Sequence, residues 1–341
     1  MIPATDGASP QMQMFQMTFD GFVAARTCYA AAKLRIPDFL GEGARASDEL
    51  AEEIEVDSRA LYRLLRALTT VGLLIEEPGR RFSLTELGDT LRSDAPGSMR
   101  AWVEFCGDPY YLEAWMHIVH SIQTGGPAFD HVHGAALFDY LAEHPEESLV
   151  FDEAMTSLTA ADAPEILAAY DFAPFERVID IGGGQGTLLF EILRAHTGAT
   201  GVVFDRPHVI EGVAKRIAEL GLESRCDVAS GDFFTAVPED GDAYLLKFIL
   251  HDWDGAACER ILSSCRRAIS PGGKLLAIET VIAPPGVPSH SKLDDIEMMV
   301  LLGSQERTEE EYRALLERSQ FRLARVVPVT WWLNVIEADP L

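Results

Sequence analysis

A glycine-rich turn follows a short apolar run near the middle of the chain, in the segment VIDIGGGQGT at residues 178–187. Such a turn, between a strand and a helix, usually presents backbone N–H groups to a ligand. The spacing fails the G-x-G-x-x-G pattern of dinucleotide sites, because Thr187 stands where the third glycine should fall. The chain also has no G-x-x-x-x-G-K-[ST] phosphate loop. The turn therefore predicts a nucleotide-like ligand that needs no pyrophosphate cradle.

Carboxylates stand at the ends of the neighbouring apolar runs. Asp180 precedes the glycine turn, Asp205 ends the run GVVFD, and Asp232 and Phe233 follow a third run. A carboxylate at Asp205 can bind both hydroxyls of a ribose, although dinucleotide enzymes also use that position. A Gly-Asp pair after a strand can be a plain turn. Together with the glycine turn, the three acidic strand ends predict an adenosine site, with Asp232 accepting from the base and Phe233 packing on it.

His251 and Asp252 follow a fourth apolar run, in KFILHDWDG. Asp252 or Asp254 can be the N-cap of the next helix, and for Asp254 we expect that role. A helix start has no need of an imidazole, so we expect His251 to face the ligand and to take part in catalysis. Glu279 ends the fifth run, and Glu306 opens a predicted helix that begins ERTEEEY. Either glutamate can belong to the same site or be merely solvated.

The elements that carry these residues alternate in type after residue 175. Five short apolar or β-branched runs are separated by helical segments, and two further runs, FRLARVVPV and WLNVIEA, follow each other directly. This order is typical of a mainly parallel sheet with helices on both faces, closed by an antiparallel hairpin. Ligands of such sheets bind beyond the carboxyl ends of the strands. We therefore predict an α/β, Rossmann-like sheet of seven strands with its site at that edge.

The first half of the chain is mainly helical. Residues 12–34 are apolar on most faces, which predicts burial in a core or in a subunit interface. Two more helices, with Ser47 and Asp57 as expected N-caps, precede a hairpin with a Pro-Gly turn. Helix, helix and hairpin form the outline of a winged helix. Residues 1–100 carry 11 Lys and Arg against 15 Asp and Glu, so a dimerisation module is favoured over a DNA-binding one.

Composition and charge narrow the classes of function. The 341 residues are 48% hydrophobic, with a net charge of −26. These values predict a folded protein and disfavour nucleic acid as a partner. Five cysteines without C-x-x-C spacing, and a start without a signal peptide, are typical of reduced thiols in a cytoplasmic protein. No apolar run approaches the ~18 residues of a membrane span, so no membrane partner is expected.

Six segments resemble, in order and spacing, the motifs of the S-adenosylmethionine-dependent O-methyltransferases of the caffeate and hydroxyindole type. These segments are VIDIGGGQGT, FDRPHVI, GDFF, LLKFILHDWDG, GGKLLAIET and GSQERTEEEY. The resemblance covers nearly the whole chain and implies a class I methyltransferase sheet, a winged-helix dimerisation domain, a homodimer and S-adenosyl-L-methionine as cofactor. The cofactor-binding residues that it implies are Gly182, Gly184, Asp205, Asp232, Phe233, Lys247 and Trp253. It also implies His251 as the general base, flanked by Glu279 and Glu306.

The implied substrate is an aromatic small molecule with a hydroxyl group, of the phenolic, phenazine or polyketide type. An aromatic-rich stretch between the two halves of the chain predicts core packing for most of its members and a flat apolar pocket for some. The residues expected to line the substrate pocket are Phe105, Trp115, Met155, Asp252, Met298 and Met299. No metal is expected. The expected domains are 1–100 for dimerisation, 101–170 as a helical connector that contributes to the pocket, and 171–341 for cofactor binding and catalysis.

Two other functions stay open at this level. A member of the family can bind S-adenosylmethionine and catalyse a non-methylating reaction, such as a pericyclic step or a hydroxylation coupled to decarboxylation. The presence of His251 with both glutamates favours methyl transfer. The other function is a winged-helix regulator, which the acidic charge of the first half disfavours.

Overall fold

The computed structural model describes residues 8–341 and shows two compact units. One unit contains the residues up to Leu112 together with Leu149–Ala161, and the other contains Glu113–Ser148 with Asp162–Leu341. The helices between residues 101 and 170 are thus divided between the two units. The three domains expected from the sequence stay a prediction.

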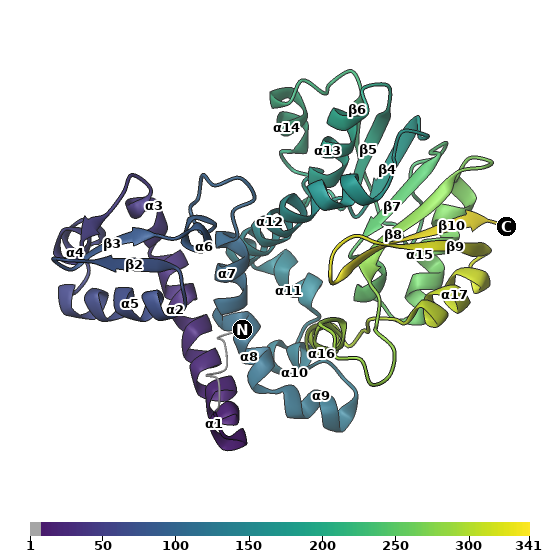
Figure 1. Cartoon of the computed structure of the whole chain (residues 1–341). Coiled ribbons are helices and arrows are strands. Elements are labelled where there is room, and N and C mark those ends of the chain that lie inside the picture. Colours follow the sequence, from purple (N-terminus) through teal and green to yellow (C-terminus); the bar gives the residue numbers. More distant parts are fainter. Residues whose placement is uncertain (1–7) are drawn as a thin grey trace. The chain divides into compact units, whose positions relative to one another are not determined.

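The first unit is helical and carries a small three-stranded sheet in the order β1-β3-β2 (Figure 1). Its strands are β1 (Arg45–Ala46), β2 (Leu74–Glu77) and β3 (Arg81–Leu84). Its helices are α1 (Pro10–Phe15), α2 (Gly21–Lys33), α3 (Ile36–Leu40), α4 (Ser47–Ile54), α5 (Ser58–Thr70), α6 (Glu86–Asp89) and α7 (Arg100–Gly107), with a π-helical turn η1 (Gln16–Asp20) between α1 and α2. Helices α8 (Pro109–Met116) and α12 (Pro145–Ala169) each have residues in both units.

Helix α5 and the β2–β3 hairpin reproduce the predicted winged-helix outline. Asp57 caps α5 as expected, because its Oδ1 accepts a hydrogen bond from the N–H of Ala60 at 2.8 Å. Leu61, Leu65 and Leu68 form the buried stripe of the helix. They pack in the core of this unit, as the 3.6-residue period of the sequence predicts.

The prediction for Ser47 was wrong. Ser47 is the first residue of α4, and the residue in the capping position is Ala46. Ala46 is extended because it pairs with Arg81 in the small sheet, and the N–H of Ser47 donates to the carbonyl of Arg80. Sheet pairing therefore holds Ala46 in the extended conformation of a capping residue, and it satisfies the N–H of Ser47, one of the first donors of the helix that have no partner within the helix.

The segment α1–η1–α2 exposes a row of large apolar side chains in the single chain. Met17 is 72% exposed and Phe22 is 65% exposed, while Ala31 and Ala32, near the end of α2, are buried. Apolar residues that stay exposed over several turns of helix mark an interaction surface. The structure thus favours the interface alternative for residues 12–34 over the core alternative.

The second unit is built on a seven-stranded sheet in the order β6-β5-β4-β7-β8-β10-β9 (Figure 1). Its strands are β4 (Arg177–Ile181), β5 (Thr200–Asp205), β6 (Cys226–Ser230), β7 (Ala243–Lys247), β8 (Lys274–Thr280), β9 (Phe321–Pro328) and β10 (Leu333–Pro340). The first five pair in parallel, and β10 pairs antiparallel with both β8 and β9. This is the predicted sheet with its closing hairpin.

Helices cover both faces of the large sheet (Figure 1). On these faces lie α13 (Thr187–Ala195), α14 (Val213–Glu219), α15 (Gly255–Ala268) and α17 (Glu309–Arg318). The second unit also contains α9 (Ile118–Thr124), α10 (Ala128–His133), α11 (Leu137–Glu143) and α16 (Ser291–Leu301), and a short 3-10 turn η2 (Leu250–Asp252) follows β7. No helix among residues 8–341 has the length and apolar character to span a membrane.

The two cores of the second unit follow the period of two along each strand. In β7, Leu246 packs in one buried cluster and Leu245 in the cluster on the opposite face. Helices α15 and α17 contribute to the first cluster, whereas α13, α14 and the end of α12 contribute to the second. Since both faces are buried, the strand ends at the carboxyl edge of the sheet have fixed positions.

Candidate active site

The glycine turn lies between β4 and α13, at the carboxyl edge of the sheet. Gly182 and Gly184 both have positive φ angles, of 67° and 53°. A Cβ at position 182 would lie 2.3 Å from Cδ1 of Ile249, whereas nothing lies within 4 Å of a Cβ at position 184. The turn thus packs closely against the loop after β7 at one end and is open at the other. An open glycine backbone allows close approach of a ligand.

The carboxylate of Asp205 is tied to the glycine turn. Its Oδ2 accepts from the N–H of Gly184 at 2.9 Å, and its Oδ1 accepts from the N–H of Arg206 at 2.7 Å. Burial raises the pKa of this carboxyl group, and the two backbone donors partly oppose that effect. Asp180 is 3% exposed, and burial together with the charge of Asp205 raises its pKa to about 7. The acidic strand ends are therefore close neighbours, as the sequence predicts.

The predicted base-binding residues form the aromatic side of this edge. Cε1 of Phe233 lies 3.9 Å from the position that a Cβ of Gly182 would take. The rings of Phe233 and Trp253 have centroids 6.0 Å apart in an edge-to-face arrangement. Asp232 is exposed, and its Oδ1 accepts from the N–H of Phe234. The three predicted residues are thus brought together beside the glycine turn, with one Asp232 oxygen not used in that bond.

His251 lies in η2, directly after β7, and is 8% exposed. Its Nδ1 is 2.7 Å from Oε1 of Glu306, which is a hydrogen-bond distance, and 3.8 Å from Oε2 of Glu279. Its Nε2 is 3.4 Å from Oδ1 of Asp252. The ring also stacks on Phe248, with centroids 5.2 Å apart and planes inclined by 15°. The structure therefore joins His251 to both predicted glutamates and leaves Nε2 on the side of Asp252.

Glu279 has a second role that the sequence did not suggest. Its Oε1 accepts from the N–H groups of Ile249 and Leu250, at 3.1 Å and 2.7 Å. These are charge-assisted bonds to the backbone of the loop that carries His251. Glu279 thus fixes the position of this loop, while Glu306 binds the imidazole itself.

The prediction that Glu306 opens a helix was wrong. Helix α17 begins three residues later, with Thr308 as N-cap and Glu311 completing the capping box. Residue 307 instead forms a parallel bridge with Val281, just after β8. An extended segment beside β8 places Glu306 next to Glu279, which the first turn of a separate helix need not do.

The electrostatics of His251 are dominated by burial and by carboxylates. Burial alone would lower the pKa of the imidazole, but Glu306, Glu279 and Asp252 outweigh it and hold that pKa well above its ordinary value. Burial in turn raises the pKa of Glu279 and of Asp252 to about 7, against the favourable charge of His251. The groups therefore titrate as one interacting set, and a proton that binds to one of them changes the pKa of the others.

The same cluster also has a spacing that can hold a metal ion. In the described part of the chain, His251, Glu279 and Glu306 bring one ligand atom each within 4.8 Å of one another. The 2.7 Å separation of Nδ1 and the Glu306 oxygen is a hydrogen-bond distance. Two ligands at ~2.0–2.2 Å from a tetrahedral zinc lie further apart than this. The geometry favours direct pairing, and the absence of a metal stays a prediction.

Several buried polar atoms around this edge have no hydrogen-bond partner among residues 8–341. They are Nζ of Lys247, Oδ2 of Asp162, Nε1 of Trp253, Oε2 of Glu279 and Oε2 of Glu306. Buried donors and acceptors are nearly always satisfied in folded proteins, so such a group calls for a ligand or bound water. The residues present thus fit a ligand that carries polar and charged groups.

Two functional residues were missed from the sequence. Phe248, which stacks on His251, has a φ of 55°, a left-handed conformation that is costly for a bulky residue. Arg307 is 3% exposed, and its guanidinium donates to the carbonyls of Leu250 at 2.7 Å and Trp253 at 2.8 Å. It therefore clamps both ends of the His251 turn. A charged residue in the polar stretch ERTEEEY gave no sign of burial.

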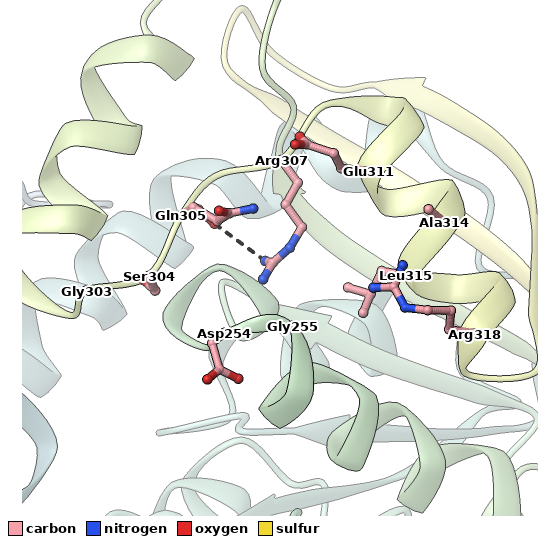
Figure 2. A pocket seen from close by; sticks show the side chains of 10 residues that line it. All are labelled: Asp254, Gly255, Gly303, Ser304, Gln305, Arg307, Glu311, Ala314, Leu315 and Arg318. Atoms are coloured by element: carbon pink, nitrogen blue, oxygen red, sulfur yellow. Dashed lines mark hydrogen bonds between the residues drawn. The ribbon is translucent and has the colours of Figure 1, made fainter. Parts of the chain in front are cut away.

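Figure 2 shows a hollow behind this clamp, where Arg307 extends toward the start of α15. The hollow has a volume of about 240 Å³, and Asp254, Ser304, Glu311 and Arg318 are among the residues that line it. None of the predicted cofactor-binding or catalytic residues lines it. Asp254 has its expected role there, because its Oδ1 accepts from the N–H of Ala257 and caps α15. This hollow is thus separate from the candidate site.

The residues predicted to line a substrate pocket are found in both units. Phe105 is buried in the first unit, in an aromatic cluster with Trp102, Tyr111 and Phe151, and Met155 belongs to the same unit. In the second unit, Met298 and Met299 lie on α16, Trp115 lies on α8, and Asp252 faces His251. Of the six, Asp252 is the one brought into contact with the catalytic candidates. Their role as pocket residues stays a prediction.

Comparisons with known proteins identify the family of this chain. Residues 17–94 match the O-methyltransferase dimerisation domain, and residues 115–322 match the O-methyltransferase domain. The phenazine O-methyltransferase PhzM of Lysobacter antibioticus is 42% identical over 336 residues, covering 98% of each chain. The comparisons give no support to a non-methylating reaction or to a winged-helix regulator.

Solved structures give the same result. The crystal structure of LaPhzM superimposes with a TM-score of 0.92 at 41% identity, over 98% of this chain and 100% of the other. Human N-acetylserotonin methyltransferase, in complex with S-adenosylmethionine, superimposes with a TM-score of 0.90 at 25% identity, over 99% of each chain. The chain carries the family's dimerisation domain and is a homodimer. It belongs to the S-adenosylmethionine-dependent O-methyltransferases.

Proposed function

We propose that this protein transfers the methyl group of S-adenosyl-L-methionine to a hydroxyl of an aromatic small molecule, with His251 as the general base. The observation that carries this proposal is the 2.7 Å contact between Nδ1 of His251 and Glu306. A carboxylate on Nδ1 fixes the tautomer and the orientation of the ring, so Nε2 is the free proton acceptor. Asp252, near Nε2, is then on the side of the hydroxyl-bearing substrate.

The proposed methyl transfer requires a general base from the protein. The cofactor, when bound, supplies a methyl group on a positively charged sulfur. A phenol with a pKa of ~10 is roughly 0.1% ionised at pH 7, so the hydroxyl must lose its proton as it attacks. A positioned imidazole can contribute about 10²–10⁴-fold to such a step. The carboxylates beside Nδ1 stabilise the imidazolium that forms.

The raised pKa of His251 has two opposed effects on this role. A more basic imidazole takes a proton from the hydroxyl more readily, but a larger fraction of it is already protonated at neutral pH. The positive charge of the cofactor, when it is bound beside the ring, would lower the imidazole pKa again by Coulomb repulsion. We therefore expect the activity to fall at acid pH, where the imidazole is protonated, and turnover to rise as the pH rises through the imidazole pKa.

We assign the cofactor to the edge formed by the glycine turn and the strand ends. Asp205 would hold the ribose, and Asp232 and Phe233 would hold the adenine. Gly182 and Gly184 would allow the methionine part to approach the backbone, while Lys247 and Trp253 would complete the site. These roles are supported by the proximity of the residues and by the unsatisfied atoms of the last two.

The substrate class that we propose is a flat, hydroxylated polycyclic aromatic molecule. The name of the 42% identical relative, a phenazine O-methyltransferase, supports this class. We further propose that Phe105, Trp115, Met155, Asp252, Met298 and Met299 line its pocket, and that residues 1–100, 101–170 and 171–341 act as dimerisation, connector and catalytic regions. The cytoplasm is the proposed location.

The test is a methylation assay with the purified protein, labelled S-adenosylmethionine and a panel of hydroxylated phenazines, naphthols and phenols, read by mass spectrometry. His251→Ala should lower turnover by about 10²–10⁴-fold and leave the affinity for S-adenosylhomocysteine unchanged. The loss should shrink for a nitrophenol that is already ionised at neutral pH. Wild-type turnover of an ordinary phenol by His251→Ala would exclude His251 as the base.

A further inference from the structure

A buried ion pair joins the end of α12 to the end of β7 in the second unit. Nζ of Lys247 lies 3.3 Å from Oδ2 of Asp162, and the two side chains are 7% and 6% exposed. Lysine and aspartate are almost never buried to this extent without a partner. Burial lowers the pKa of Lys247 to about 8 and raises that of Asp162, each against the attraction of the other. The pair is therefore held away from water.

The contact between the two groups is incomplete. A charge-assisted hydrogen bond between an ammonium and a carboxylate measures about 2.7–2.9 Å, which is shorter than the 3.3 Å found here. Neither atom has a hydrogen bond to any other group in residues 8–341. Removing two charges from water costs several kcal/mol per ion, and only good geometry with additional hydrogen bonds offsets that cost. A ligand that brings one anionic and one cationic group would complete both partners.

The pair lies where the fold favours ligand binding. Lys247 is the last residue of β7, and β7 is the neighbour of β4, whose end carries the glycine turn. The strand order changes direction between β4 and β7, and crevices at such a switch point bind ligands. Ala163, directly after Asp162, is fully buried in the core cluster that also contains Leu245 of β7. The position of Asp162 is thus fixed by core packing.

The proposed cofactor has the complementary chemistry. One end of S-adenosylmethionine is an adenosine, for which Asp205, Asp232 and Phe233 provide partners. The other end is an amino acid with an α-ammonium and an α-carboxylate. Lys247 matches the carboxylate, but none of the residues predicted from the sequence was assigned to the ammonium. Asp162 offers the missing negative charge.

We propose that Asp162 is a donor-positioning residue, which binds the α-ammonium of the methyl donor while Lys247 binds its α-carboxylate. This inference rests on the proposed function, because it assumes the donor site described above. It adds a selection step: the site distinguishes ligands with an intact amino acid end from adenosine derivatives that lack it. Anchoring that end also limits where the sulfur, and thus the methyl group, can lie relative to His251.

Calorimetry with two ligands tests the assignment. S-adenosylhomocysteine has the amino acid end, and 5′-methylthioadenosine lacks it. Asp162→Asn, which keeps the shape of the side chain and removes its charge, should weaken S-adenosylhomocysteine binding by about 10- to 100-fold. Its affinity for 5′-methylthioadenosine should stay within about two-fold of the wild-type value. Glu165→Gln is the matched control, because Glu165 lies on the same helix and is exposed; it should change neither affinity.

A third ligand separates the two partners of the pair. Decarboxylated S-adenosylmethionine keeps the ammonium and lacks the carboxylate. Its binding should weaken in Asp162→Asn and should be unaffected in Lys247→Met, whereas S-adenosylhomocysteine binding should weaken in both variants.

Wild-type affinity of Asp162→Asn for S-adenosylhomocysteine would overturn the inference. An equal loss for 5′-methylthioadenosine would also overturn it, because damage to the fold affects both ligands alike. Should Asp162→Asn fail to fold, Asp162→Ser provides the same comparison. A wild-type protein that binds none of these ligands would instead refute the proposed function.

Discussion

Replacement of Glu306 by glutamine tests the electrostatic role of the residue that contacts His251. Both side chains are buried, and Oε1 of Glu306 lies 2.7 Å from Nδ1 of His251. Two unit charges about 4 Å apart interact by about 4 kcal/mol at an effective dielectric constant of ~20. Glu279 and Asp252 remain in the variant and retain part of this attraction. We therefore expect Glu306→Gln to lower the imidazole pKa of His251 from its raised value.

The sign of the pH effect follows from the role of the base. His251 must be neutral to accept a proton, so kcat/KM falls on the acid side as the imidazole becomes protonated. Removing a neighbouring negative charge destabilises the imidazolium, and the acid limb should move to lower pH. The maximal rate should also fall, because the less basic imidazole is a weaker proton acceptor. The measurement is kcat/KM between pH 5 and 9 with one phenol, together with an NMR titration of the His251 ring.

Glu310→Gln is the control for this experiment, since Glu310 is exposed and lies four residues away. Its acid limb should coincide with that of the wild-type protein. An acid limb of Glu306→Gln that stays in place, or that moves to higher pH, would refute the Coulombic pairing. An acid limb at the wild-type pH, together with an unchanged maximal rate, would also show that Glu306 does not orient the ring.

Three further outcomes are expected. Asp205→Ala should weaken S-adenosylhomocysteine binding by about 1.5–3 kcal/mol in calorimetry, because the ribose loses hydrogen bonds to a charged group; unchanged affinity would remove Asp205 from the site. Arg307→Lys keeps the charge but loses the forked geometry, so thermal unfolding should show a loss of stability and kcat should fall with the donor affinity unchanged. Met17→Asp together with Phe22→Asp should turn the dimer into a monomer in light scattering, because charges would enter an apolar interface; a dimer that persists would exclude this surface.

Local patterns in the sequence predicted most of the second unit. Each of the five parallel strands appeared as a short apolar run, because a strand buried on both faces needs apolar residues at successive positions. The roles of Asp57 and Asp254 as N-caps were also predictable, since a cap depends on residues three or four positions away. Features that depend on near neighbours in the chain were therefore accessible.

Features that depend on distant partners could not be predicted from the sequence. Asp162 and Lys247 are 85 positions apart and meet only because α12 and β7 share a core. Arg307 reaches carbonyls more than 50 residues earlier, and nothing in its neighbourhood marks it as buried. Ser47 was predicted as the N-cap because a serine precedes the helical pattern, but sheet pairing places Ala46 in the capping position. In each case contacts between distant residues determined the structure, and the local sequence pattern either gave no sign of them or allowed more than one structure.

The three carboxylates around His251 differ in what they contact, and this difference explains why the site needs more than one. Glu306 binds Nδ1 and sets the orientation of the ring. Glu279 accepts from two backbone N–H groups and fixes the loop, while its charge also acts on the imidazole. Asp252 lies beside Nε2, where the substrate hydroxyl would approach. A single carboxylate could raise the basicity of His251, but the same group could not also hold the loop and lie beside Nε2. The division of these tasks follows from the fold, because β8, the segment before α17 and the turn after β7 meet at one edge of the sheet.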